Sequence, residues 1–127
     1  MKNQDMQMEI ILENYKNPHN YGRMDDPSVK LLQYNPVCGD AVQFFIKIRE
    51  GKIDDISFIG RGCSISQGAA SILTDLVKGK GIQDVKNMTR EQFLDIIGLD
   101  LGPSREKCAL LSYNTLMKCL ESAHGDE

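Results

Sequence analysis

Two neighbouring stretches of alternating hydrophobic and polar residues, joined by a glycine-containing link, constrain the fold of this chain most strongly. Residues 41–50, "AVQFFIKIRE", alternate with one exception, and residues 52–60, "KIDDISFIG", repeat the pattern. A period of two is typical of strands with one buried face, and Gly51 in the "REGK" link suits a tight hairpin. A shorter stretch, "VKLLQY", precedes them. The pattern predicts a three-stranded antiparallel sheet.

Helical patterns flank the predicted sheet on both sides. Residues 4–17 carry hydrophobic side chains at an imperfect helical spacing, and the proline of Asn17-Pro18 ends that segment. After Cys63 the pattern changes to "SISQGAASILTDLVKGK", for which Ser64 is a suitable N-cap. The remaining predicted helices cover residues 81–88, residues 89–98 with Thr89 as the N-cap, and residues 105–122.

The order of these elements and the size of the chain indicate one α+β domain. The 127 residues are enough for a hydrophobic core and contain no repeat or linker, so we expect a single domain over residues 1–127. Because helices precede and follow the run of strands, we expect a three-stranded antiparallel sheet with helices packed on it.

Composition argues against two classes of partner. The net charge is −3 and the sequence pI is about 5.4, with no run rich in Lys or Arg, so nucleic acid is a poor candidate. No segment approaches the roughly 18 apolar residues of a membrane span, and the N-terminus lacks the apolar core of a signal peptide. We therefore expect a cytoplasmic protein whose cysteines stay reduced.

Three of the four cysteines lie where predicted elements begin or end. Cys38 lies in the turn "NPVCGD", Cys63 lies between the last strand and a helix, and Cys108 follows a glycine-proline break at the start of the last helix. Side chains at element ends can converge without being buried in a core. Helix N-termini near Cys63 and Cys108 favour the thiolate, which binds soft metals and attacks sulfur.

Asp40 adds a carboxylate two residues after Cys38. Three thiolates and one carboxylate suit tetrahedral Zn²⁺, or form an incomplete thiolate set for an iron–sulfur cluster. A carboxylate in place of a fourth cysteine should hold iron less firmly, which suits a cluster that is passed on.

A simpler reading exists for each of these residues, because a lone cysteine is often a small buried hydrophobic residue. We prefer that reading for Cys119, which lies in the middle of a helix among Leu116, Met117 and Leu120. His19 and His124 are expected to be surface residues rather than ligands. The spacing of the other three cysteines matches no CxxC zinc-ribbon pattern, so spacing alone does not assign a site.

Four motifs in order make the chain resemble the IscU, SufU and NifU N-terminal domain family of iron–sulfur cluster assembly proteins. "YKNPHNYG" resembles the family's N-terminal loop, "NPVCGD" its first-cysteine motif, "GRGCSISQGAAS" its second and "SREKCALLSYNTL" its third-cysteine helix. The resemblance runs from about Tyr15 to Leu120. It implies the SufE/NifU-like fold and one site made by Cys38, Asp40, Cys63 and Cys108.

The sequence shares features with more than one branch of that family. IscU-type proteins have a histidine before the third cysteine, in a segment that a chaperone recognises, whereas this chain has "LGPSREKC" with Lys107 before Cys108. Neither property can therefore be transferred. "GCSIS" and "REKCA" resemble SufU, but the short distance between Cys63 and Cys108 resembles IscU and NifU.

The resemblance leads to three hypotheses. The first is a scaffold that takes sulfur from a cysteine desulfurase, assembles a transient [2Fe–2S] cluster and passes it to apo-proteins. The second is a zinc-dependent sulfurtransferase using the same four groups. The third is a structural zinc site, which is disfavoured because such sites usually have closely paired Cys and His ligands.

Within the first two hypotheses, Cys108 is the expected sulfur acceptor. The family resemblance points to Cys108, and its position at a helix start beside the positive charges of Lys107 and Arg105 should lower the pKa of its thiol. The expected partners are the desulfurase and apo iron–sulfur proteins, and the expected oligomeric state is a monomer or a weak homo-oligomer.

Overall fold

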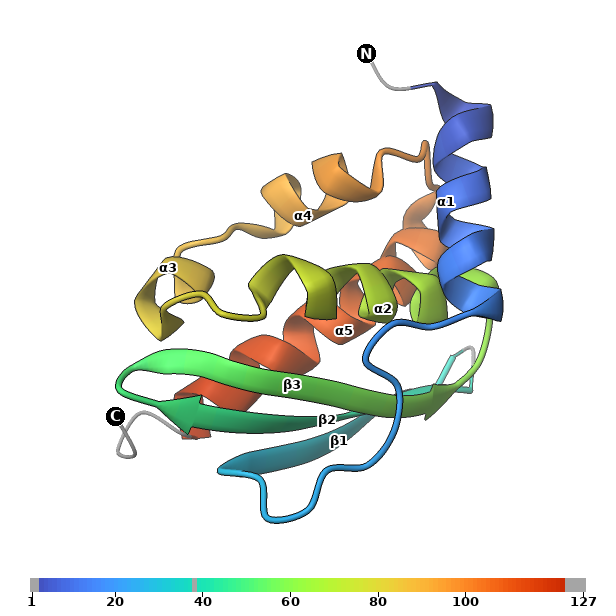
Figure 1. Cartoon of the computed structure of the whole chain (residues 1–127). Coiled ribbons are helices and arrows are strands. Elements are labelled where there is room, and N and C mark those ends of the chain that lie inside the picture. Colours follow the sequence, from blue (N-terminus) through green and yellow to red (C-terminus); the bar gives the residue numbers. More distant parts are fainter. Residues whose placement is uncertain (1–2, 38, 123–127) are drawn as a thin grey trace.

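The computed structural model describes residues 3–37 and 39–122 and contains one three-stranded antiparallel sheet with helices on one of its faces (Figure 1). This architecture confirms the predicted α+β fold class. Among the described residues, no helix is both long and apolar enough to cross a lipid bilayer. The elements in chain order are α1 (Gln4–Lys16), β1 (Val29–Asn35), β2 (Asp40–Arg49), β3 (Lys52–Arg61), α2 (Ser64–Val77), α3 (Ile82–Lys86), α4 (Arg90–Ile97) and α5 (Pro103–Ser122).

The sheet follows the alternation of the sequence. β2 is the central strand, paired with β1 on one side and β3 on the other. Val42, Phe44 and Ile46 are fully buried on the helix-covered face, as the alternation predicts. Glu50 and Gly51 both have positive φ, at 52° and 72°, which is the conformation of a two-residue hairpin turn. The "REGK" prediction is therefore confirmed.

Local capping sets the ends of several helices. The side chain of Asn3 accepts a hydrogen bond from the Met6 backbone N–H and starts α1. Thr89 and Gln92 form a complete capping box at the start of α4, so the prediction of Thr89 as N-cap is confirmed. α5 begins at Pro103, earlier than the predicted residue 105, because proline is well suited to the first helical position.

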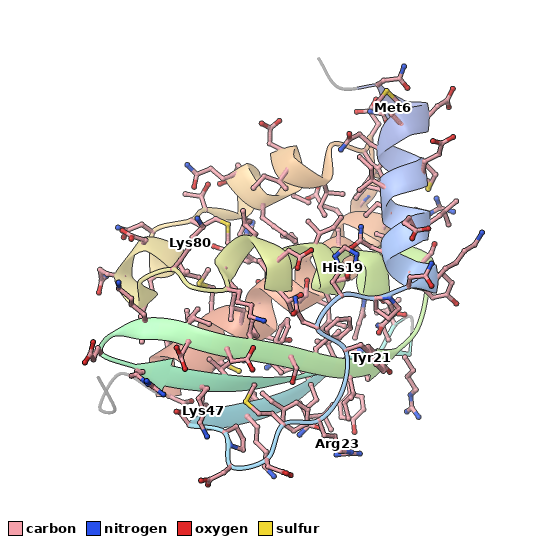
Figure 2. The ribbon with its side chains drawn as sticks, in the orientation of Figure 1. Met6, His19, Tyr21, Arg23, Lys47 and Lys80 are labelled. Atoms are coloured by element: carbon pink, nitrogen blue, oxygen red, sulfur yellow. The ribbon has the colours of Figure 1, made fainter. Side chains whose placement is uncertain are left out.

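The loop after α1 runs along the outer edge of β3 and then crosses to the start of β1 (Figure 1). Backbone hydrogen bonds join it to β3: Gly22 donates to the Phe58 carbonyl, and Phe58 donates to the Asn20 carbonyl. On the helix side, Nδ1 of His19 shares a hydrogen bond with the carboxyl group of Asp75 of α2, and Figure 2 shows His19 beside that helix. His19 is thus an exposed loop residue, as expected, and it does not belong to the group of potential ligands found among the described residues.

Close packing joins α1 to α2. A Cβ atom at Gly68 would lie 2.7 Å from the Ile11 carbonyl oxygen, so only glycine allows the two helices to approach this closely. Behind them, the core includes Ile11, Leu73 and Leu116, all fully buried. α2 is therefore held rigidly against α1, which fixes the position of its first residues at the end of the sheet.

Candidate metal centre

Three side chains meet where β2 begins and β3 ends. Asp40 is the first residue of β2, Cys63 follows β3 and precedes α2, and Cys108 comes from α5. One potential ligand atom from each residue lies within 4.8 Å of the other two. It is the one such group of three or more Cys, His, Asp or Glu residues in the described part of the chain. The structure therefore brings together three of the four residues expected to form one site.

Asp40 is linked directly to Cys63. Its Oδ1 accepts a hydrogen bond of 3.0 Å from the Cys63 backbone N–H, and its Oδ2 lies 3.8 Å from the Cys63 thiol, which can donate to it. The carboxyl group is almost fully buried at 1% exposure, whereas Cys63 is exposed. The carboxylate thus lies on the inner side of the site and Cys63 on its solvent side.

Gly62 allows this contact. Its φ of +138° lies in a region that other residues rarely adopt. A Cβ atom at this position would lie 2.1 Å from Oδ1 of Asp40 and 2.8 Å from its Cγ, which is a severe overlap. Gly62, the second glycine of "GRGCSIS", is therefore needed both for the turn and for the approach of the Asp40 carboxyl group.

The N-cap of α2 is Cys63 rather than Ser64, which corrects the prediction from the sequence. Cys63 has extended backbone angles, φ −72° and ψ 165°, and its Sγ accepts a hydrogen bond of 3.5 Å from the Ser66 N–H. Ser64 is already the first helical residue. The Cys63 sulfur thus lies at the N-terminal end of α2, where a backbone N–H points at it. Serine preference alone misplaced the cap by one residue.

Cys108 is buried at 4% exposure and belongs to the hydrophobic core cluster. This corrects two expectations, namely that it lies in the first turn of its helix and that it avoids the core. Because α5 starts at Pro103, Cys108 falls in the second turn, at the beginning of the buried part of the helix. Its neighbours Arg105 and Lys107 are exposed, so they place positive charge at the surface near this thiol.

The other two cysteines differ in status. Cys38 lies outside the described residues, so its expected place in the site stays a prediction; His124 also lies outside them. Cys119 is fully buried, and burial raises the pKa of its thiol from 9.0 to about 12. Cys119 is therefore a core residue, which confirms the simpler reading of this cysteine.

Gln67 supports the site in a way that the sequence analysis missed. Its Nε2 donates to the carbonyl oxygens of Ala41 and Arg61 at 3.3 and 3.0 Å, and also lies 3.1 Å from Ser66 Oγ. It therefore links the start of β2 to the end of β3 beside the site. The sequence did offer one sign of this role: Gln67 is a large polar residue within a helical segment made mostly of small and apolar residues.

The donor set determines which metals suit the site. Thiolates prefer Zn²⁺ and iron–sulfur clusters, whereas Mg²⁺ and Ca²⁺ prefer oxygen donors alone. Two thiols beside one carboxylate thus fit zinc or an iron–sulfur cluster. Solvent reaches the site at Cys63, which is exposed. The preceding residue, Gly62, lines an indentation of about 300 Å³ together with residues that include Arg61 and Tyr15.

Comparison with known proteins identifies the family. The model of the NifU-like N terminal domain matches residues 6–125. The chain belongs to this family. The predicted resemblance to IscU, SufU and NifU N-terminal domains is therefore confirmed.

Relatives from two functional groups match most of the chain. The zinc-dependent sulfurtransferase SufU of Bacillus subtilis is 34% identical over 135 residues, which cover 92% of this chain and 90% of the relative. The iron–sulfur cluster assembly scaffold protein IscU of Aquifex aeolicus is 36% identical over 110 residues, covering 85% of this chain and 69% of the relative. The names of these relatives therefore include both the scaffold function and the sulfurtransferase function that the sequence suggested.

Solved structures of family members share the fold. The N-terminal NifU-like protein of Brucella abortus aligns with a TM-score of 0.77 at 18% identity, over 98% of this chain and all of that chain (100%). An iron–sulfur cluster assembly scaffold protein for the SUF system from Fervidobacterium islandicum AW-1 aligns with a TM-score of 0.74 at 26% identity, over 88% and 94% of the two chains.

Proposed function

We propose that this protein is an iron–sulfur cluster assembly scaffold. The observation that carries the proposal is the convergence of Asp40, Cys63 and Cys108, with ligand atoms within 4.8 Å of one another at one end of the sheet. Cys38 would complete the set. Relatives named as IscU scaffolds support the proposal. In this function the protein takes persulfide sulfur from a cysteine desulfurase, an external reductant converts that sulfur to sulfide, and the sulfide combines with iron as a [2Fe–2S] cluster that is passed to apo-proteins.

Two features of the site suit a cluster that leaves. Cys63 is exposed, so a recipient thiol can approach the iron next to it. Asp40 offers a hard oxygen donor, which binds iron of a cluster less firmly than a fourth thiolate would. A cluster intended to stay is usually enclosed by four cysteines, and this arrangement is more open.

Sulfur would arrive as the outer atom of a persulfide on the desulfurase. A thiolate of the scaffold attacks that atom, a new S–S bond forms, and the desulfurase thiolate leaves with the electron pair of the old bond. We propose Cys108 as the acceptor, beside the positive charges of Arg105 and Lys107. Because Cys108 is buried, the residues over it must move before the donor reaches it, whereas Cys63 is reachable directly. Mass-spectrometric mapping of the persulfide in Cys108→Ser and Cys63→Ser distinguishes these two acceptors.

The scaffold function is tested by anaerobic reconstitution. The protein is incubated with a cysteine desulfurase, cysteine, a thiol reductant and ferrous iron, and an apo-ferredoxin is then added. We expect cluster absorbance to develop on this protein and then move to the ferredoxin. Cys38→Ser, Cys63→Ser and Cys108→Ser should each abolish it, whereas Cys119→Ala, which changes a core cysteine away from the site, should not.

The alternative function is that of a zinc-dependent sulfurtransferase. The 34% identity to SufU of Bacillus subtilis over most of both chains favours it, as does Lys107 in place of a histidine. Bound zinc would keep the thiolates deprotonated and protected until sulfur is delivered. In the same experiment this function predicts zinc that stays bound, no cluster, and an increased turnover of the desulfurase.

A further inference from the structure

Buried donors without partners point to a further residue at the site. In the described part of the chain, three buried side-chain atoms have no hydrogen-bond partner: Asn35 Nδ2, Ser57 Oγ and Ser112 Oγ. Burying a donor without an acceptor costs free energy, so each such group in a native protein calls for an explanation, such as a bound ligand. Of these three residues, Asn35 is the one that the strand register places opposite a residue of the site, Asp40.

The orientation of the Asn35 amide follows from its other contacts. Its Oδ1 accepts a hydrogen bond of 3.2 Å from the Val37 backbone N–H. Because only the oxygen of an amide can accept, this contact assigns the other atom as the NH₂ group. The Asn35 carbonyl oxygen is also used, by the Gly39 N–H at 2.8 Å. The side-chain NH₂ group is thus the part of Asn35 left to bind something else.

The register of the sheet places this amide next to the metal centre. Asn35 of β1 pairs directly with Asp40 of β2, at the end of the β1–β2 ladder. Directly paired residues point to the same face, with Cβ atoms about 5 Å apart. That face is the buried one, because Asn35 is 8% exposed while the preceding residue, Tyr34, is 58% exposed. The NH₂ group therefore lies on the same face as the Asp40 carboxyl group.

We propose that the Asn35 side chain is a positioning residue that donates an N–H hydrogen bond to a sulfur atom held in the site. This inference rests on the proposed function, because it requires a metal or cluster bound by thiolates. Among the described residues alone, two thiolates and one carboxylate would carry three negative charges, more than a divalent metal neutralises. A neutral donor pointed at one sulfur lowers the charge on it and orients it, and such outer contacts usually tune metal affinity.

The test uses Co²⁺ as a spectroscopic substitute for Zn²⁺. The full chain is titrated anaerobically with Co²⁺, recording the dissociation constant and the energy of the sulfur-to-cobalt charge-transfer band. Asn35→Ala removes the donor and also the turn contact to Val37. Asn35→Asp keeps an oxygen for that contact but cannot donate when ionised. Ser57→Ala is the matched control, because it removes an equally unpartnered group on the sheet face away from the helices.

A donor to sulfur predicts one pattern of results. Asn35→Ala should weaken Co²⁺ binding about tenfold or more. Both Asn35 variants should move the charge-transfer band to lower energy, because the thiolate loses a hydrogen bond. Ser57→Ala should leave the affinity and the band unchanged. Urea unfolding of each metal-free variant checks that it folds.

Two results would overturn the inference without touching the proposed function. In the first, Asn35→Ala folds and has the same charge-transfer band energy and the same Co²⁺ affinity as the wild type, which would mean that the NH₂ group binds only water. The other is a band shift in Asn35→Ala alone, which would assign the effect to the lost turn contact. A wild-type chain that binds neither Co²⁺ nor a cluster would instead overturn both the inference and the proposed function.

Discussion

Gly62 determines both the turn of the backbone after β3 and the approach of Asp40 to Cys63 in the candidate metal centre. The chain leaves β3 through a φ of +138° and places the Cys63 N–H 3.0 Å from Oδ1 of Asp40. A side chain at position 62 would collide with that carboxylate. The geometry of the site therefore depends on the absence of a side chain at position 62. A search for ligand residues alone would not find this position.

We predict that Gly62→Ala weakens Zn²⁺ binding by about tenfold to a hundredfold, because Asp40 must move away from Cys63. The strained backbone should also cost about 1–3 kcal/mol of stability. Gly22→Ala is the matched control, since Gly22 has a φ of +135° but nothing within 4 Å of its would-be Cβ. Isothermal titration with zinc and urea unfolding give both quantities. Equal zinc affinity in the two variants would contradict this role of Gly62.

Cys119 gives a prediction about pH. Its pKa in the folded chain is about 12 rather than 9.0 because burial disfavours the thiolate. Between these values the unfolded chain has released the proton and the folded chain keeps it. Stability from this group is therefore complete below pH 9.0 and falls as pH rises toward 12, by about 1.4 kcal/mol per pH unit at most.

The measurement is the free energy of unfolding from neutral to alkaline pH in the wild type and in Cys119→Ala. Burial also raises the pKa of Tyr113, but this group is common to both proteins, so the difference isolates Cys119. The wild type should lose its advantage over the variant progressively above pH 9.0. A constant difference across the alkaline range would show that Cys119 does not titrate in this way.

At the scale of elements, the start of α2 organises the site. Cys63 caps the helix, and Gln67, one turn later, donates to carbonyl oxygens at the start of β2 and the end of β3. A single helix end thus holds together the two strand ends that supply Asp40 and Cys63.

Gln67→Met should therefore reduce both stability and zinc affinity. Loss of the amide removes two hydrogen bonds and leaves the buried Ala41 carbonyl oxygen short of a donor, which we expect to cost about 1–3 kcal/mol. The end of the β2–β3 ladder is then held less firmly, so zinc binding should weaken several-fold. A zinc titration measures the affinity, and a thermal melt of the same variant measures the stability.

Thr89→Ala provides the control for that experiment. It removes the capping box of α4, a helix that supplies none of the three grouped ligand residues, and should cost about 1 kcal/mol. If Thr89→Ala lowered zinc affinity as much as Gln67→Met, general loss of stability would explain the effect and the specific role of Gln67 would be rejected.

Most of the whole molecule could be predicted from the sequence. Period-two alternation and a glycine link gave the sheet, and helical spacing gave the helices, because both patterns reflect the burial of one face. The resemblance of four motifs to a known family indicated which residues meet, and Asp40, Cys63 and Cys108 do meet. Distances of this kind between residues far apart in sequence cannot be obtained from periodicity alone.

Local sequence patterns do not predict the position of a residue on which several elements act. Serine preference pointed to Ser64, but the turn at Gly62 makes Cys63 the cap. A helix-start position suggested an unburied Cys108, but the packing of α5 on the sheet buries it. The roles of Gln67 and Asn35 depend on which strand ends lie beside them, and a local pattern does not contain that information.

We propose that Cys38, Asp40, Cys63 and Cys108 together hold one metal. X-ray absorption at the zinc edge of the zinc-loaded protein tests it most directly, because it counts the ligands. We predict three sulfur atoms at about 2.3 Å and one oxygen at about 2.0–2.2 Å, unchanged in Cys119→Ala and reduced to two sulfur atoms in Cys38→Ser. Four sulfur atoms, or a shell of nitrogen and oxygen alone, would contradict the account.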